Sequence, residues 1–366
     1  WAFLAMILWL SVLTGAIDLP TRFDHVSWHA HEFLFGYLGA VLAGFLLTAV
    51  PNWTGRLPMI GWRLAALSAL WLVGRIAVLF SADLPVAAAP ALDLAFPLVL
   101  GGMILREIVA GKNWRNLMVL ALLAVFTIAN GLFHLDALRG DYAAQGVGLR
   151  LGLATAVMMI AVIGGRIIPS FTRNWLARTN NLARPKPPMQ HFDKLVLLFS
   201  IAILALWVAD PFAHRTGIAL IVLGLLHSAR LIRWQGHHTA SEPLVWILHV
   251  SYAFIPLGAF ALGLDPLLGN FSTAGPQHLW MAGAIGSMTL AMMSRATLGH
   301  TGHALSANRK TLSIYLSLFG AVLARVLTSI WPDLSYVSGI LWLLAFLGFA
   351  WTYGPMLLRA KPEKNL

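Results

Sequence analysis

Long apolar runs dominate the chain, and each is long enough to cross a bilayer. A helix rises about 1.5 Å per residue, so about 20 apolar residues cover a hydrocarbon core of about 30 Å. The sequence therefore predicts an all-α integral membrane protein, a single bundle of about twelve transmembrane helices that takes in residues 1–366 as one polytopic domain. The spans are expected at 1–17, 30–50, 62–80, 88–106, 116–135, 148–168, 193–210, 214–232, 243–263, 278–298, 311–330 and 336–358.

The composition agrees with a bilayer environment and limits the metal chemistry. The chain is 59% hydrophobic and 11% charged, whereas soluble domains have about 45–50% apolar and about 25% charged residues. It contains no cysteine, which excludes disulfides, iron–sulfur clusters, thiolate copper centres and covalently attached c-type haem. Any metal ion must be held by His, Met or carboxylate side chains. The run Trp1 to Ile17 lacks the features of a signal peptide, so we expect it to be the first span.

The basic residues are distributed as the positive-inside rule requires. Nineteen of the 25 Lys and Arg lie on one alternating set of connections, Arg22, Arg139 and Arg215 lie on the other, and three lie within spans. Both termini are therefore predicted to be cytoplasmic. The net charge of +11 follows the membrane, so the expected partner is the lipid bilayer and not nucleic acid. The longest loop, 174–192, is basic and contains prolines, and is predicted to be a solvated cytoplasmic connector that favours anionic headgroups.

Four histidines are predicted to lie at the outer ends of spans and to bind a metal. Polar groups at membrane depth are costly and therefore indicate function, and neutral imidazole is the commonest metal ligand. Two of the four are spaced i and i+2, about 200° apart on a regular helix. Both can ligate one ion only if the first helical turn is frayed; otherwise they serve two neighbouring cofactors. The candidates are His29, His31, His134 and His278.

Three further histidines lie toward the inner side, on consecutive spans and at similar depth. They are His227, His249 and His300. A lone buried histidine is usually bonded to a neighbouring carbonyl, but three together favour a cofactor site. His278 and His300 are 22 residues apart on one helix, which is about 33 Å at about 1.5 Å per residue. They cannot share a metal, so either there are two sites or one cluster is structural.

The arginines within spans favour an anionic cofactor on the outer side. Arg75, Arg150 and Arg325 all fall in outer halves of spans, and Asp93 supplies one carboxylate. This leaves excess positive charge, which haem propionates would neutralise because guanidinium binds carboxylate bidentately. In the alternative, Arg75 pairs with Asp93 and the other two reach water or headgroups.

Five segments carry a family resemblance. They are WHAHEFLFGYLGAVLAGFLLTAVPNWTGR (28–56), GGRIIPSFT (164–172), HSARLIRWQG (227–236), LHVSYAFIPLG (248–258) and GAIGSMTLAMMSRATLGHTG (283–302). These segments resemble the NnrS family, and the resemblance runs nearly end to end. It implies a twelve-span protein of the bacterial inner membrane that contains haem b and copper and responds to nitric oxide. The matching histidines are the seven named above, His29, His31, His134, His227, His249, His278 and His300.

The chain is expected to be a haem–copper protein that binds nitric oxide and detoxifies or reduces it. This activity would serve protection against nitrosative stress and denitrification. Whether the protein is an oxidoreductase similar to nitric oxide reductases stays open, and quinol is the expected electron donor. The alternative is a transporter of a metal, haem or small anion, because Pro97 and Pro256 interrupt spans. A transporter would have internal repeats and a midplane site, whereas no repeat is evident. A haem-dependent sensor or assembly factor would need a larger output surface than the loop 174–192.

Overall fold

The structure is a computed structural model, and it describes residues 1–183, 185–269 and 274–358. These residues contain twelve helical segments joined by loops and short turns. No strand occurs among these residues. Each segment overlaps one predicted span, which confirms the all-α fold, although several bounds differ: the second segment is His25–Thr54 and the sixth is Val147–Arg178, against predicted spans of 30–50 and 148–168. Four of the basic residues counted for orientation lie outside the described residues, namely Arg184, Arg359, Lys361 and Lys364. The cytoplasmic location of the termini stays a prediction.

Ten of the segments are long and apolar enough to cross a membrane, so the chain is a multi-pass membrane protein. The other two predicted spans correspond to α1 (Ala2–Leu13), of 12 residues, and to the helical segment from Ala274 to His300. The predicted span 1–17 extends four residues beyond the C-terminal end of this helix. The helix ends at Leu13 because Gly15 adopts a φ of 70°, a left-handed conformation that terminates helices.

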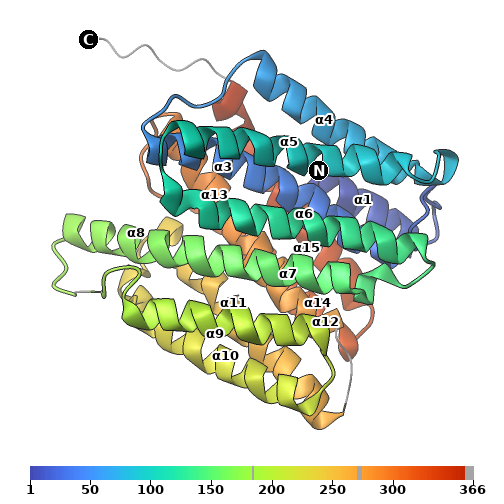
Figure 1. Cartoon of the computed structure of the whole chain (residues 1–366). Helices are drawn as coiled ribbons and strands as arrows, with labels where there is room; N and C mark the ends of the chain where they lie inside the picture. The colour runs from blue at the N-terminus through green and yellow to red at the C-terminus, as the bar shows by residue number, and fades with distance from the viewer. Residues whose placement is uncertain (184, 270–273, 359–366) are drawn as a thin grey trace. The chain divides into compact units, whose positions relative to one another are not determined.

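The chain divides into two compact units, Trp1–Ala156 and Val157–Leu366, which we describe separately. The single domain expected from the sequence stays a prediction. In the first unit α2 (His25–His31) continues through a π-helical stretch, Glu32–Tyr37, into α3 (Leu38–Thr54). Three helices follow, α4 (Trp62–Leu79), α5 (Ala88–Ala110) and α6 (Leu117–Leu138), and then α7 (Val147–Met159), in which the unit ends. Helix α5 packs against α3, α4 and α6, and the pair α4 and α5 is seen in Figure 1.

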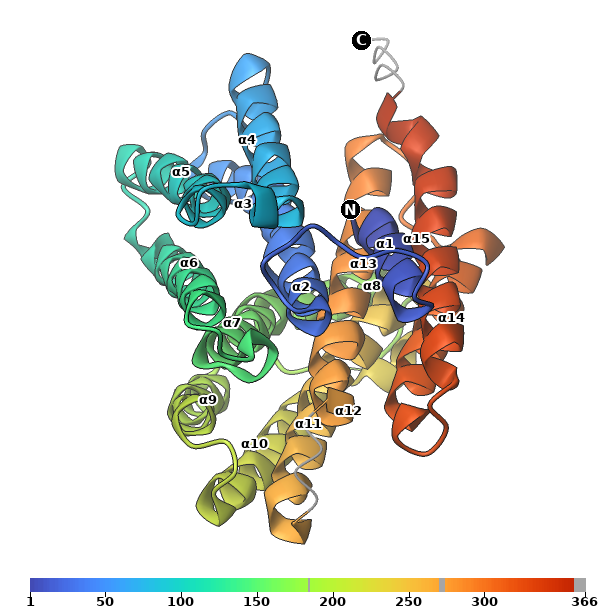
Figure 2. The same cartoon turned by 90° about the vertical axis from the view of Figure 1, so that its right-hand side faces the viewer.

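The second unit begins at the end of α7 and contains two further π-helical stretches. The first, Ile160–Gly164, leads into α8 (Gly165–Arg178). Helices α9 (His191–Ala209), α10 (His214–Ile232) and α11 (Pro243–Leu268) pack in sequence. The second stretch, Leu279–Gly286, joins α12 (Ala274–His278) to α13 (Ser287–His300). Last come α14 (Arg309–Val326) and α15 (Leu334–Leu358), which lie side by side in Figure 2.

Close helix packing in the second unit depends on a pair of glycines. A Cβ at Gly217 of α10 would lie 2.7 Å from the carbonyl oxygen of Gly263, and a Cβ at Gly263 of α11 would lie 2.8 Å from that of Gly217. The two backbones therefore touch where neither residue has a side chain. Membrane helices associate largely through such packing, because lipid supplies no hydrophobic force between them.

Each π-helical stretch adjoins a polar residue or a polar contact. One begins directly after His31 and another directly after His278. An inserted residue widens the turn and redirects the side chains that follow, and such bulges are frequent at functional sites. In the remaining stretch, Ile160–Gly164, the carbonyl of Ala161 accepts a hydrogen bond from Arg230.

Candidate metal centre

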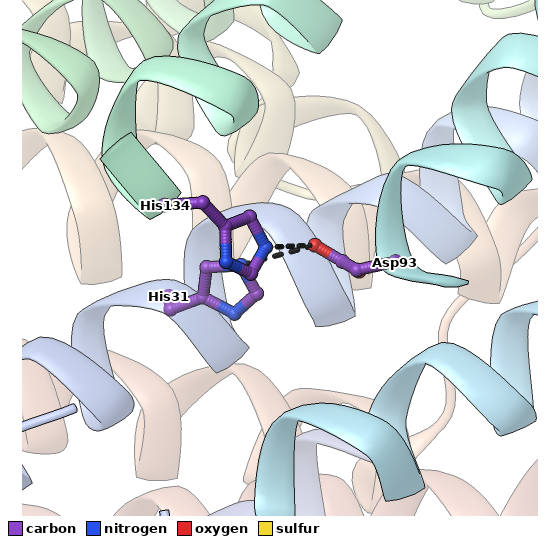
Figure 3. A group of neighbouring side chains, drawn as sticks. All are labelled: His31, Asp93 and His134. Carbon is purple, nitrogen blue, oxygen red and sulfur yellow. Dashed lines mark hydrogen bonds and ion pairs between the residues drawn. The ribbon is translucent and has the colours of Figure 1, made fainter. Parts of the chain in front are cut away.

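Two histidines and an aspartate from three helices converge in the first unit. His31 ends α2, Asp93 lies in α5 and His134 lies in α6. The Nε2 atoms of His31 and His134 lie 3.2 Å and 2.9 Å from Asp93 Oδ2, and Figure 3 shows both imidazoles directed at this carboxylate. One ligand atom from each residue lies within 4.8 Å of the other two, and all three residues are buried. This is the spacing of a set of donors that can share one ion.

The local sequence explains why His31 occupies this place. Asp24 caps the N-terminus of α2, its side chain accepting from the backbone N–H of Ser27 at 2.9 Å, which satisfies one of the free donors of the first turn. The Ser27 hydroxyl in turn accepts from the backbone N–H of Ala144 at 2.9 Å. The short helix is thus tied at its start to the 143–145 turn, and its last residue is held in the interior.

The local sequence also affects the geometry of α5 at Asp93. Pro97 stands four residues later within α5, and a proline cannot donate the helical hydrogen bond to the carbonyl four residues before it. Helix α5 is therefore loosened at the residue that faces the two histidines.

Glu32 and Arg75 hold the group in its orientation. His31 Nδ1–H donates to Glu32 Oε1 at 3.0 Å, which turns Nε2 toward Asp93. A carboxylate behind the imidazole in this manner is the usual partner of a metal-ligating histidine. Arg75 donates to the same Glu32 oxygen at 2.8 Å and also pairs with Asp93 Oδ1. Asn130 Nδ2 donates to Asp93 Oδ2 at 2.8 Å.

The buried charges of this group balance only if His31 is protonated or a cation is bound, because Glu32 and Asp93 carry two negative charges against the single positive charge of Arg75. Two carboxylates, Glu32 and Asp93, face a single guanidinium, Arg75, and all three side chains are at most 2% exposed. With neutral imidazoles the net charge is one negative, and a buried unbalanced charge is costly. In addition, Glu32 Oε2 and Arg75 Nε have no hydrogen-bond partner in the described structure. The donor set and the charge both fit a bound metal cation.

Aromatic rings and a cavity determine access to the group. The rings of Phe23, Phe35 and Phe133 lie 5.2 to 5.4 Å from the His31 ring, centre to centre. A cavity of about 340 Å³ is lined by His134 and Phe23, and also by the exposed Arg22. The cavity borders the group on the His134 side, and phenyl rings pack around His31.

The structure separates the predicted metal ligands. His31 and His134 come together, whereas His29 stacks on Trp9 at 4.3 Å, as expected if residues i and i+2 point apart on a helix. His278 belongs to the second unit, where its Nδ1–H donates to the Ala274 carbonyl at 2.6 Å. Its role as a metal ligand stays a prediction. From the sequence, Asp93 is predicted only as a partner for Arg75. The sequence signal that points to Asp93 as a site residue is an aspartate four residues before a proline within an apolar span.

The predicted propionate-binding arginines have protein partners. Arg75 pairs with Asp93, the alternative given above, and also with Glu32. Arg150 donates to the Gln145 carbonyl, and Arg325 donates to Thr328 Oγ1 at 2.5 Å. Their binding of haem stays a prediction.

Of the predicted inner histidines, His227 is fully engaged within the second unit. Ser200 Oγ–H donates to the Val196 carbonyl at 2.6 Å, so Ser200 can only accept from His227 Nε2–H at 3.0 Å. His227 Nδ1 then accepts from the Tyr252 hydroxyl at 2.7 Å. Both ring nitrogens of His227 are occupied by hydrogen bonds.

His249 and His300 differ from His227. The Thr172 hydroxyl donates to the Ile168 carbonyl at 2.8 Å, so His249 Nε2–H donates to Thr172 Oγ1 at 2.8 Å. The Nδ1 atom of His249 is buried and lacks a hydrogen-bond partner within the described residues. His300 is exposed at the end of α13.

A buried ion pair in the second unit was missed from the sequence. Arg230 is one of the nineteen basic residues that the sequence predicts on the cytoplasmic connections, which is wrong: it lies within α10 and is 0% exposed. Its Nε donates to Asp193 Oδ1 at 2.8 Å, and its NH1 donates to the Ala161 carbonyl at 2.7 Å and to the Tyr252 hydroxyl at 2.9 Å. The neutralising partner is 37 residues away along the chain, so local sequence could not reveal it.

The fold and this group define a class, a polytopic membrane protein with a buried histidine–carboxylate site that fits a metal ion. The family model described as NnrS protein matches residues 1–361. The chain therefore belongs to the NnrS family, which confirms the resemblance seen in the sequence. No curated protein and no solved structure matches the chain.

Proposed function

We propose that this protein of the bacterial inner membrane contains copper and haem b, binds nitric oxide and detoxifies or reduces it. Membership of the NnrS family supports the link to nitric oxide, in nitrosative-stress protection and denitrification. The observation that carries the proposal is the buried group His31, Asp93 and His134. The proposal leaves open whether capture or turnover is the physiological role.

Copper is the ion proposed for the His31–Asp93–His134 group. Imidazole nitrogen suits copper, iron and zinc alike, and here two imidazoles and one carboxylate oxygen would hold the ion. The single surplus negative charge of Glu32, Asp93 and Arg75 would be neutralised by monovalent copper. When bound, the metal would supply an open coordination position for nitric oxide.

The surrounding residues of the chain have separate tasks. Glu32 holds the His31 ring with its Nε2 directed at the site. Arg75 pairs with both carboxylates and holds them in place. The phenyl rings around His31 exclude water, and the cavity beside His134 admits a small uncharged molecule such as nitric oxide.

For haem b, the chain offers one histidine nitrogen with unused capacity among the inner candidates. His249 Nδ1 is buried and unpaired in the described structure, whereas His227 uses both ring nitrogens. His249 is therefore the proposed haem ligand. Arg150 in the first unit and Arg325 in the second are each proposed to bind a haem propionate, without assignment to the haem held by His249. Quinol is the proposed electron donor.

The transporter alternative gains no support from the helices that suggested it. Helices α5 and α11 continue through Pro97 and Pro256 and are not broken there, whereas transporter sites are typically formed by discontinuous helices.

The test is metal and haem quantitation on detergent-purified protein, by elemental analysis and a pyridine haemochrome spectrum, before and after addition of nitric oxide. We expect copper and iron near stoichiometric amounts and a b-type spectrum that changes with nitric oxide. The variants His31→Ala, His134→Ala and Asp93→Asn should each lose copper. His25→Ala is the matched control, because His25 is on the same helix but is exposed and paired with Asp18. Full copper occupancy in all three variants would refute the site.

A further inference from the structure

A second cavity of the first unit lies away from the candidate metal centre. It has a volume of about 380 Å³ and is formed by the end of α3, the connection to α4, and α5 near its C-terminus. Three arginines line it, Arg56, Arg63 and Arg106. This Arg56–Arg63–Arg106 pocket lies at the end of these helices that is predicted to be cytoplasmic.

The pocket carries an excess of positive charge. Arg56 Nε pairs with Glu107 Oε2 at 2.5 Å. No carboxylate pairs with Arg63 or Arg106 anywhere in the described residues, and Arg63 lies over the Trp62 ring at 5.7 Å. The four charged residues that line the pocket therefore sum to two positive charges. Two guanidiniums without partners at one cavity are complementary to phosphate.

The same pocket is rimmed by exposed apolar side chains in a connection. Leu57 is 90% exposed, and Ile60 and Trp62 are each 76% exposed. The first two lie between the end of α3 at Thr54 and the start of α4 at Trp62, hence outside the spans. Apolar residues beside arginines at the end of a span are suited to the interface, where acyl chains begin and headgroup phosphates lie.

We propose that the Arg56–Arg63–Arg106 pocket binds the headgroup of an anionic phospholipid. The phosphodiester lies between Arg63 and Arg106, and the acyl chains leave along Leu57, Ile60 and Trp62. A neutral quinol headgroup would leave the charge of the pocket unbalanced. A zwitterionic phospholipid would place its own cation beside the arginines, so a net anionic lipid is favoured.

The experiment is native mass spectrometry of the delipidated full-length protein, titrated with phosphatidylglycerol or with phosphatidylcholine. Phosphatidylglycerol should bind at lower concentration than phosphatidylcholine. Arg63→Gln/Arg106→Gln should weaken phosphatidylglycerol binding roughly thirtyfold, from the usual contribution of a basic residue near an anionic surface. The matched control, Lys112→Gln/Arg115→Gln, removes two exposed charges at the same end of α5 that do not line the pocket, and should bind as wild type.

The outcomes separate the proposal from its rivals. Equal binding of the two lipids by wild type overturns it, and this comparison needs no variant to fold. Equal loss of binding in both double variants also overturns it, because it shows a general charge effect. Displacement of the lipid by millimolar inorganic phosphate would assign the pocket to a free anion instead. The circular dichroism spectrum of each variant serves as the folding check, so the result does not depend on the proposed function.

Discussion

Arg230→Met tests whether the buried ion pair organises the second unit. Methionine fills much of the space of arginine but has no charge and no donor. The substitution removes the hydrogen bonds to Asp193, Ala161 and Tyr252, and leaves the Asp193 carboxylate, which is 2% exposed, without its counter-ion. Breaking a buried pair by removing one partner costs about 3–5 kcal/mol.

The expected loss can be separated from a general effect of removing an arginine. Arg233 lies just after α10, partly exposed, and donates to Gln190 Oε1 at 3.0 Å. Arg233→Met should therefore cost only about 0–1 kcal/mol. In Asp193→Asn/Arg230→Met the buried charge is absent, and the new amide side chain retains an oxygen to accept from the Gln190 N–H, as the Asp193 carboxylate does at 3.0 Å. The double variant should recover a large part of the stability.

The assay is the free energy of unfolding in detergent micelles, measured by denaturant titration with circular dichroism and tryptophan fluorescence. All four proteins are compared in the same micelle. If Arg230→Met lies within about 1 kcal/mol of Arg233→Met, or if the double variant is no more stable than Arg230→Met, the account of a charge-balanced interior is wrong.

Three further outcomes follow from the first unit. Gly148→Ala should lower the free energy of unfolding by about 1–3 kcal/mol, because the new Cβ would strike the Phe133 backbone. Gly101→Ala, whose new Cβ would have nothing near it, is the control and should not lower the melting temperature. Glu32→Gln should weaken copper affinity about 10–100-fold by loosening the His31 ring, which a competition titration with a copper chelator measures; unchanged affinity would remove Glu32 from the site. Removing copper from wild type should lower its melting temperature, since an ion bound only by the folded state stabilises it; Asp93→Asn should show no further change on the same treatment.

The helices and their number were accessible from the sequence, and so were two of the three residues of the site, His31 and His134. The apolar period of α4, for instance, begins at Trp62 in both the prediction and the structure. His31 and His134 stand out because an imidazole in an apolar run is rare. Asp93 was visible as a residue but not as a ligand, because the distance from α5 to α2 and α6 is a property of packing.

Arg230 shows the same limit in the other unit. A positively charged side chain near the end of a span is typical of a loop between spans. Arg230 can be buried because Asp193 on α9 lies beside it and neutralises its charge. Tertiary contacts also distinguish the inner histidines. Both ring nitrogens of His227 form hydrogen bonds with hydroxyl groups of residues far away in the chain, whereas Nδ1 of His249 has no hydrogen-bond partner within the described residues.

The sequence by itself determined that this chain lies in a membrane, how many apolar helical segments it has, and which family it resembles. These follow from hydropathy and short-range patterns, since a backbone in lipid must satisfy its hydrogen bonds within each helix. Only the tertiary structure decided which polar residues meet: His31 and not His29 beside Asp93, and Arg230 in the interior with Asp193. The free energy of a buried charge depends on partners brought together by helix packing, and those partners are far apart in the chain.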